Sequence, residues 1–405
     1  MDNNKRVVIT GIGIISSNAI GIKNFSNAIF NGISGIKSIS SFDTSDFKVK
    51  TAGEINNFKP EEFLGQKGLR TLDRSTKLIC SAAKLALDDG GLEITENNTY
   101  DTGVVVATTL GPVKSICDFD KDATVDGVRY VNPAFFPNTV INSPASQVSI
   151  KFNIKGFNTT ISNGFSAGLD AINYASNFIK LNRAKTILVG AVEDFYAQVF
   201  IGFYKSGLLA GLGSGLELSC PFDKRRNGMI LSEGSCVLIL EDLDSALNRN
   251  ANIYAEILGY GMSDYNLEIK DAMQVALEKS NIKTDKIDYI CAGANSMQDL
   301  DYKETLAIKE LFGKNISRQK VSSIKSMVGE CFSASSTIQV AAGLCAIKEQ
   351  MIPATINYQE KDLRCDLDYV TNKAISYKVE NVLINALGPA NCSYASSLVI
   401  SKFNN

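Results

Sequence analysis

Arg6-Val-Val-Ile-Thr-Gly-Ile-Gly-Ile-Ile-Ser16 is the stretch of sequence that decides the fold. Residues 6–10 form an apolar run of strand length, and we expect Gly11 and Gly13 to end the strand. The run is continuously apolar and does not alternate with polar residues. The pattern therefore predicts a strand that is buried on both faces of a sheet.

Similar apolar runs recur along the chain and alternate with segments of helical spacing. Within residues 74–89, for example, Leu78, Ala82 and Leu85 follow a helical period, and the segment stops at a pair of glycines. Further strands are predicted at residues 103–107, 158–161, 186–192, 235–240, 255–260, 289–292, 382–386 and 396–400, and further helices at 166–180, 271–279, 303–312 and 335–348. Apolar strands between helices predict an α/β architecture.

Length and composition limit the classes of protein to consider. The 405 residues suffice for two closely packed halves, which we place at 1–246 and 247–405 because residues 242–252 are charged and rich in Asn. A net charge of −2 gives no footprint for nucleic acid, and no run approaches the ~18 apolar residues that cross a bilayer. The N-terminus does not resemble a signal peptide. We expect a cytoplasmic protein with no nucleic-acid or membrane partner.

The cysteines and histidines restrict the chemistry. Nine cysteines lack CxxC spacing, which argues against a disulfide framework and a structural zinc site. The chain has no histidine, the side chain best suited to proton transfer at neutral pH and the commonest metal ligand. Mechanisms that depend on a Ser-His or Cys-His pair, or on a histidine-bound metal, are therefore excluded, and we expect neither a metal nor a cofactor.

Six segments carry a family resemblance. They are the opening strand, Phe42-Asp-Thr-Ser-Asp-Phe47, Leu72-Asp-Arg-Ser-Thr76, Pro221-Phe-Asp-Lys-Arg-Arg-Asn-Gly228 with Ser232-Glu-Gly234, Lys325-Ser-Met-Val-Gly329 and Asn385-Ala-Leu-Gly388. In this order they resemble the landmarks of the β-ketoacyl-[acyl carrier protein] synthases of fatty-acid and polyketide assembly, including the signatures PFDxxRDGFxxGEG and KSxxGH. The resemblance implies a thiolase-like fold, a five-layered αβαβα sandwich of two similar halves, which is usually dimeric.

The resemblance also locates the nucleophile position. In the family, a cysteine in a CxSG turn begins a buried helix, whose terminus favours the thiolate that takes up the acyl chain. Here the turn is Asn163-Gly-Phe-Ser-Ala-Gly168, so Phe165 occupies that position and cannot be acylated. We expect Phe165 to fill the vacant acyl site. Ser166 has no histidine to deprotonate it and is expected to be a helix N-cap.

Three further positions depart from the family pattern. The two family histidines that assist decarboxylation and stabilise the enolate correspond to Gly293 and Glu330, and a carboxylate would repel a developing enolate. Glu330 is expected to pair with Lys325, unless Lys325 holds structural carboxylates such as Glu233. Pro389 falls on the gating phenylalanine of the family's GFGG loop, and proline has no N–H for an oxyanion hole. Four losses together indicate that selection for catalysis has relaxed.

A synthase-like chain that lacks these catalytic groups resembles the chain length factors, or ketosynthase β-subunits, of type II polyketide systems. The resemblance implies a heterodimer, or a heterotetramer, with an active ketosynthase, which an acyl carrier protein reaches through the complex. The chain would close the partner's acyl tunnel and set the length of an aromatic polyketide or aryl-polyene product. Many relatives carry Gln at the nucleophile position, which is linked to malonyl decarboxylation, and Phe165 departs from that pattern.

The candidates for the tunnel wall lie in the segment that corresponds to the family's dimer contact. A bulky side chain limits chain growth because overfilling a packed interior costs about 1–3 kcal/mol or more. The candidate residues are Phe135, Phe136, Thr139 and Val140, with Leu110 and Pro112 nearby. The alternative interpretation makes them ordinary homodimer or core residues.

Two other functions remain open. The chain could be a malonyl-carrier decarboxylase or acyltransferase with a relocated nucleophile, for which Cys331, directly after Glu330, is the candidate thiol. It could also be a homodimeric scaffold or a carrier-docking subunit with no influence on product length.

Overall fold

The computed structural model describes residues 5–213, 216–263, 269–389 and 394–404, and it consists of two halves with the same strand order. The first half contains β1 (Val7–Ser16), β5 (Thr102–Ala107), β6 (Asn158–Ile161), β7 (Thr186–Glu193) and β8 (Gly234–Asp242), ordered β1-β8-β7-β5-β6. The second contains β9 (Ala255–Met262), β10 (Tyr289–Cys291), β11 (Lys320–Ser322), β14 (Asn381–Ala386) and β15 (Ser396–Ser401), ordered β9-β15-β14-β10-β11. When the five strands of each half are numbered 1 to 5 in the order in which they occur along the chain, both halves have the spatial strand order 1-5-4-2-3.

The strand directions repeat as well. In each half the three strands farthest from the join are parallel (β6, β5 and β7; β11, β10 and β14), and the remaining pairs are antiparallel. A short pairing of β1 with β9, at Val8 with Glu256 and Ile9 with Ala255, joins the two halves. The two similar halves that we expected are therefore confirmed, although the repeat is visible in the topology and not in the sequence.

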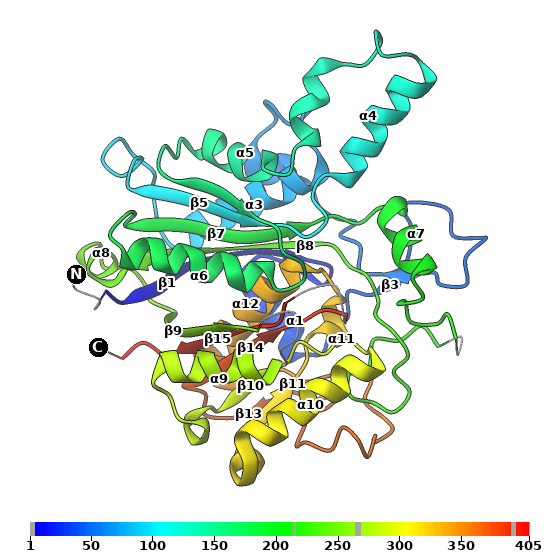
Figure 1. The fold of residues 1–405 in the computed structure, drawn as a ribbon. Helices are drawn as coiled ribbons and strands as arrows, with labels where there is room; N and C mark the ends of the chain where they lie inside the picture. The colour runs from blue at the N-terminus through cyan, green and yellow to red at the C-terminus, as the bar shows by residue number, and fades with distance from the viewer. Residues whose placement is uncertain (1–4, 214–215, 264–268, 390–393, 405) are drawn as a thin grey trace.

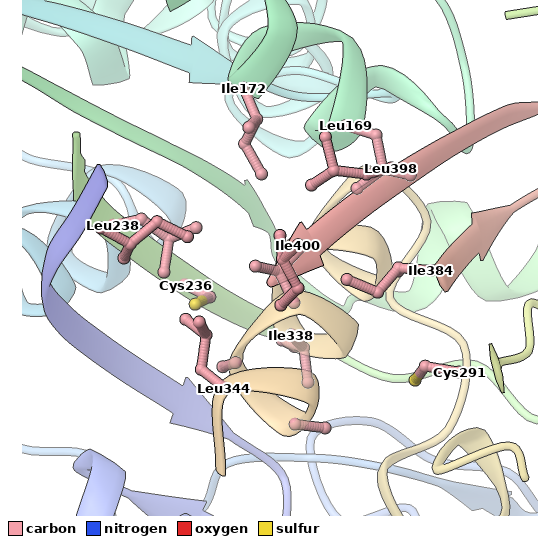
Figure 2. Close-up of a cluster of buried hydrophobic side chains, with 14 of the residues drawn as sticks. Leu169, Ile172, Cys236, Leu238, Cys291, Ile338, Leu344, Ile384, Leu398 and Ile400 are labelled. Atoms are coloured by element: carbon pink, nitrogen blue, oxygen red, sulfur yellow. The ribbon is translucent and has the colours of Figure 1, made fainter. Parts of the chain in front are cut away.

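Helices form the other three layers (Figure 1). One outer layer holds α3 (Arg74–Asp89) and α5 (Ser143–Phe152), the middle layer α6 (Ala167–Lys180) and α12 (Ser333–Glu349), and the other outer layer α9 (Ile269–Ser280) and α10 (Gln298–Phe312). Every residue of α12 from 333 to 347 is buried, because the helix lies between the two sheets. Figure 2 shows apolar side chains of α6, α12, β8, β14 and β15 gathered in this middle layer. The five-layered αβαβα sandwich is confirmed.

The opening strand corrects one prediction. Gly11 and Gly13 do not end β1, which continues to Ser16 and pairs with β8 along its length. A Cβ atom on Gly13 would lie 1.8 Å from the backbone oxygen of Ala82, and one on Gly11 would lie 2.6 Å from that of Ala86. The glycines are needed because α3 packs directly on the strand backbone, a close approach that any side chain would prevent.

Most predicted elements agree with the structure to within a few residues, and the segments 74–89 and 158–161 agree at both ends. Sequence analysis missed α4 (Val113–Val125), the 3-10 helix η1 (Pro133–Thr139), α5 and α7 (Ala197–Lys205). No residue of α4 is buried, and its few apolar residues are interspersed with charged ones, so the helix gives only a weak signal in the sequence. Together α4 and η1 project from the body (Figure 1), and we call residues 113–141 the arm.

A short helix, α8 (Leu243–Asn248), lies where we predicted the join between the halves, and the boundary at 246 stays a prediction. No helix of the described residues is long and apolar enough to cross a membrane. The remaining elements are α1 (Ile22–Phe30), α2 (Glu61–Leu64), α11 (Lys325–Val328), β2 (Ala19–Ile20), β3 (Lys37–Ser38), β4 (Thr51–Ala52), β12 (Met351–Ile352), β13 (Ile375–Ser376), η2 (Thr284–Lys286) and η3 (Gly313–Arg318).

Candidate functional site

Phe165 lies in the turn that leads into α6, and its ring is packed among other aromatic rings. It is 5% exposed, and it meets Phe332 in an edge-to-face contact with the ring centroids 5.3 Å apart. Phe332 in turn lies 5.0 Å from Phe203. Phe165 and Phe332, with Phe195 and Phe200, belong to one buried apolar cluster, which we call the aromatic cluster, and the partly buried Phe203 packs against it. Phe165 is thus a buried aromatic side chain, whereas its filling of a vacant acyl site stays a prediction.

Phe332 holds an unusual backbone conformation, with φ at 50° and ψ at −121°. A positive φ in a bulky residue costs on the order of 1–3 kcal/mol, so the surroundings must enforce it. Its N–H donates to Glu330 Oε1 at 3.0 Å, and its ring is packed between Phe165 and Phe203. The strained residue thus connects the aromatic cluster to the carboxylate at position 330.

Glu330 is 1% exposed and is fully engaged by donors. Lys325 Nζ lies 2.8 Å from Oε2, and Asn295 Nδ2 donates to the same oxygen at 2.8 Å. Ser335 Oγ donates to Oε1 at 2.7 Å, beside the bond from the Phe332 N–H. The predicted pair with Lys325 is therefore present. A buried carboxylate with this set of partners is held in place and does not face an open site.

Lys325 also connects this carboxylate to Gly293. Its Nζ donates to the Gly293 carbonyl oxygen at 2.9 Å, and the Gly293 N–H donates to Glu304 Oε1 at 2.9 Å. A Cβ atom on Gly293 would lie 2.1 Å from Leu387 Cδ2 and 2.9 Å from the carbonyl oxygen of Asn385. A side chain at position 293 would have to displace Leu387 and would also crowd the Asn385 backbone.

Pro389 is buried, two residues after Leu387. The next two residues of this predicted loop, Ala390 and Asn391, lie outside the described residues. Ser166 occupies the N-cap position of α6, but its side chain makes no capping bond. The hydroxyl instead donates to Asp170 Oδ2 at 3.0 Å, one turn into the helix, so the capping role we expected for that side chain is wrong.

Glu233 has a different partner from the one we considered. Arg74 binds it through two nitrogens, each 2.6 Å from a carboxylate oxygen, and the Ile55 N–H donates at 2.7 Å. Lys325 therefore does not hold Glu233. Arg74 belongs to one of the segments that carry the family resemblance. Its pairing with Glu233 could not be predicted, because no spacing rule links two residues that are 159 positions apart in the chain.

The six tunnel candidates occupy two places. Leu110 packs against the aromatic cluster, and Pro112 is the N-cap residue of α4. Phe135 and Phe136 lie on η1, 42% and 57% exposed, and Val140 follows at 40% exposed. The Thr139 hydroxyl donates to the Phe136 carbonyl oxygen at 2.8 Å. Within one chain, the candidates on the arm thus do not line the aromatic cluster.

The buried thiols of the described residues are poorly placed for nucleophilic chemistry. Cys331 is fully buried, and burial raises its pKa to about 12. A thiol with so high a pKa is almost entirely protonated at neutral pH and is therefore a weak nucleophile. The eight cysteines of the described residues are free and seven are buried, whereas Cys392 lies outside these residues. The described residues form no cluster of three or more His, Cys, Asp or Glu suited to a metal ion.

Two buried carboxyl groups escaped the sequence analysis. Burial raises the pKa of Glu193 and of Glu304 to about 7 in each case. Glu304 Oε1 accepts from Gly293 and from Asn385 Nδ2, whereas Oε2 has no partner among the described residues. A glutamate eleven residues after Gly293 gives no local signal of this contact, because a loop and a helix turn separate the two residues.

Comparisons with known proteins agree with this geometry. Residues 4–246 match the β-ketoacyl synthase N-terminal domain, and residues 254–359 match the β-ketoacyl synthase C-terminal domain. The 3-oxoacyl-[acyl-carrier-protein] synthase 2 of Coxiella burnetii is 34% identical over 397 residues, covering 95% of this chain and 96% of that protein. The protein of the same name from Staphylococcus aureus (strain COL) is 32% identical over the full length of both chains.

Solved structures show the same relationship. The ishigamide ketosynthase/chain length factor superposes with a TM-score of 0.91 at 28% identity, covering 99% of this chain and 100% of that chain. A β-ketoacyl synthase from Burkholderia phymatum superposes with a TM-score of 0.89 at 25% identity and the same coverage. This chain therefore belongs to the β-ketoacyl synthase family and has its thiolase-like α/β fold.

Proposed function

We propose that this chain is a non-catalytic subunit, a chain length factor, that pairs with an active ketosynthase in type II polyketide assembly. The observation that carries the proposal is Phe165, which stands at the nucleophile position and packs edge-on against Phe332. A phenyl ring has no atom that can form a thioester. The solved ketosynthase/chain length factor that superposes on this chain supports the same interpretation.

The two positions that hold histidine in the family, Gly293 and Glu330, and the gating loop support the proposal independently of Phe165. Gly293 carries no imidazole, and a side chain there would have to displace Leu387 and crowd the Asn385 backbone. Glu330 brings a carboxylate where the condensation requires stabilisation of a negative oxygen. Pro389 supplies no N–H. Restoring one of these positions would leave the others unsuited to condensation.

The arm supports the proposed partnership. It exposes a series of large apolar side chains, which on a soluble domain mark an interaction site. The residues more than two-fifths exposed are Ile116, Val125, Val128, Tyr130, Phe135, Phe136 and Ile141. Contact with a partner ketosynthase would cover this surface and would bring Phe135 and Phe136 toward the partner's acyl tunnel.

The experiment is coexpression with a ketosynthase that carries the cysteine and both histidines. The chain should copurify with it in equal amounts. In the assembled pair, supplied with acyl carrier protein, the double variant Phe135→Ala/Phe136→Ala should lengthen the products. Ile150→Ala is the matched control, since Ile150 is 71% exposed on α5, outside the arm. Failure to copurify would refute the proposed pairing.

The same experiment separates the proposal from the alternatives. A homodimeric scaffold or carrier-docking subunit would leave the product lengths of the double variant unchanged. A decarboxylase or acyltransferase that uses Cys331 would gain mass on that residue after incubation with an acyl-carrier thioester. The buried, protonated state of the Cys331 thiol argues against this outcome.

A further inference from the structure

The helix η1 of the arm carries one buried side chain, and that side chain is polar. Asn138 is 5% exposed, whereas the other residues of η1 are exposed or half-buried. Its Nδ2 donates to the backbone carbonyl oxygen of Thr71 at 2.6 Å, across 67 positions of the chain. Burying an amide is costly unless it is hydrogen-bonded. The bond to Thr71 therefore ties η1 to the body of the subunit.

The Thr71 carbonyl group is a fixed point of the body. It lies two residues before Asp73, the N-cap residue of α3, whose carboxylate accepts from the Thr76 N–H at 2.8 Å. The helix α3 packs directly on the backbone of β1, so its start cannot shift without disturbing the sheet. Asn138 thus connects the projecting arm to a rigid helix.

The helix η1 is stiff enough to transmit the position of this anchor. Two of its seven residues are prolines, which fix their own φ angles. The Thr139 hydroxyl, next to Asn138, donates to the Phe136 carbonyl oxygen at 2.8 Å and closes the last turn. Phe135 and Phe136 stand three and two residues before Asn138. Their position relative to the body therefore depends on the bond that Asn138 makes.

The contacts of α4 do not replace this anchor. Val113, the first residue of α4, packs against the aromatic cluster, but no residue of α4 is buried. The Ser115 hydroxyl lies 3.5 Å from Asp73 Oδ2, which is at the limit of a hydrogen bond. Phe119 meets the Phe136 ring with the centroids 6.1 Å apart, a contact within the arm that does not attach it to the body.

We propose that Asn138 is a positioning residue, whose bond to Thr71 fixes how far Phe135 and Phe136 reach into the acyl tunnel of the partner subunit. The inference rests on the proposed function, because the tunnel belongs to the partner ketosynthase. A growing acyl chain pushes against the two rings, and an anchored η1 resists the push. Without the anchor the rings yield, and the acyl chain grows further.

Hydrogen–deuterium exchange of the full-length chain, in the assembly in which it purifies, tests the anchor by itself. Asn138→Ala removes the donor, and Asn138→Asp keeps the shape but places an acceptor-only carboxylate against the Thr71 carbonyl oxygen. In both variants we expect the amides of η1 to exchange roughly two- to tenfold faster, and those of β1 and β8 to exchange as before. Unchanged exchange in η1 would overturn the proposal.

The lengths of the products test what the anchor does. In the pair with a ketosynthase that carries the cysteine and both histidines, supplied with acyl carrier protein, both variants should raise the fraction of longer products roughly two- to tenfold. Asn57→Ala is the matched control, because Asn57 is an exposed asparagine outside the arm, and it should leave the lengths unchanged. A change in Asn138→Ala without one in Asn138→Asp would show that packing and not the bond matters, and the proposal would be wrong.

A triple variant shows whether Asn138 acts through the two rings. When Asn138→Ala is added to Phe135→Ala/Phe136→Ala, the products should lengthen no further, because the rings that the anchor positions are already absent. A further, additive lengthening would contradict the proposal. If the natural chain did not copurify with the ketosynthase, the proposed function itself would be refuted. If it copurified and the lengths did not respond to the Asn138 variants, only the role of Asn138 would be refuted.

Discussion

Replacing Lys325 with methionine removes the positive charge from the deeply buried ion pair between Lys325 and Glu330 while keeping a side chain of similar length. The side chains of Lys325 and Glu330 are 3% and 1% exposed, so water cannot replace the lost partner. The variant would leave the Glu330 carboxylate with three donors and the Gly293 carbonyl oxygen without its bond from Nζ. We expect the free energy of unfolding to fall by about 3–5 kcal/mol.

Urea denaturation measures this loss as a lower midpoint at an unchanged m value. The double variant Lys325→Met/Glu330→Gln should recover part of the loss, because a neutral amide does not leave a buried charge unpaired. Lys378→Met is the matched control, since its pair with Glu380 is exposed and is worth about 0–1 kcal/mol. A loss from Lys325→Met no larger than that of the control would refute the reasoning.

Three further predictions concern the packing and ionisation of the fold. Phe165→Ala should lower the free energy of unfolding by about 3–5 kcal/mol in urea denaturation, and a loss under about 1 kcal/mol would show that the ring is not packed as described. Because burial raises the pKa of Glu304 to about 7, the folded chain holds a proton that the unfolded chain releases above about pH 4.5. Stability should therefore fall as the pH rises from about 4.5 to 7, and denaturation curves of Glu304→Gln at pH 5 and pH 8 should show a smaller fall; an equal fall would contradict the assignment. Gly13→Ala would bring Cβ to 1.8 Å from the Ala82 backbone oxygen and should prevent folding, measured as loss of the cooperative transition. Gly202→Ala in α7, where a Cβ atom meets nothing within 4 Å, should change stability by no more than about 1 kcal/mol.

Local patterns were enough to predict the framework of the fold. The helix from Arg74 to Asp89 and the buried strands appear in the sequence because their apolar residues follow one period and end at glycines or polar residues. The error at Gly11 and Gly13 has a physical reason, because a glycine that breaks a strand and a glycine that admits a helix backbone are identical in sequence. Only the position of α3 distinguishes them.

The surroundings of the candidate site were harder to predict from the sequence. The sequence identified Phe165 and Glu330 as departures from the family pattern, and Lys325 as a candidate partner for Glu330. It did not reveal Asn295 and Ser335 as further donors to that carboxylate, nor that Leu387 fills the space at Gly293. These contacts join segments far apart in the chain, and neither periodicity nor spacing encodes them.

The central claim is that this subunit cannot carry an acyl chain by itself. Intact-protein mass spectrometry tests it most directly, on the purified chain after incubation with acyl-loaded and malonyl-loaded carrier protein, with product analysis of the same mixture. We predict an unchanged mass and no β-ketoacyl product until an active ketosynthase is added. A stable acyl adduct, or condensation by the isolated chain, would contradict the account.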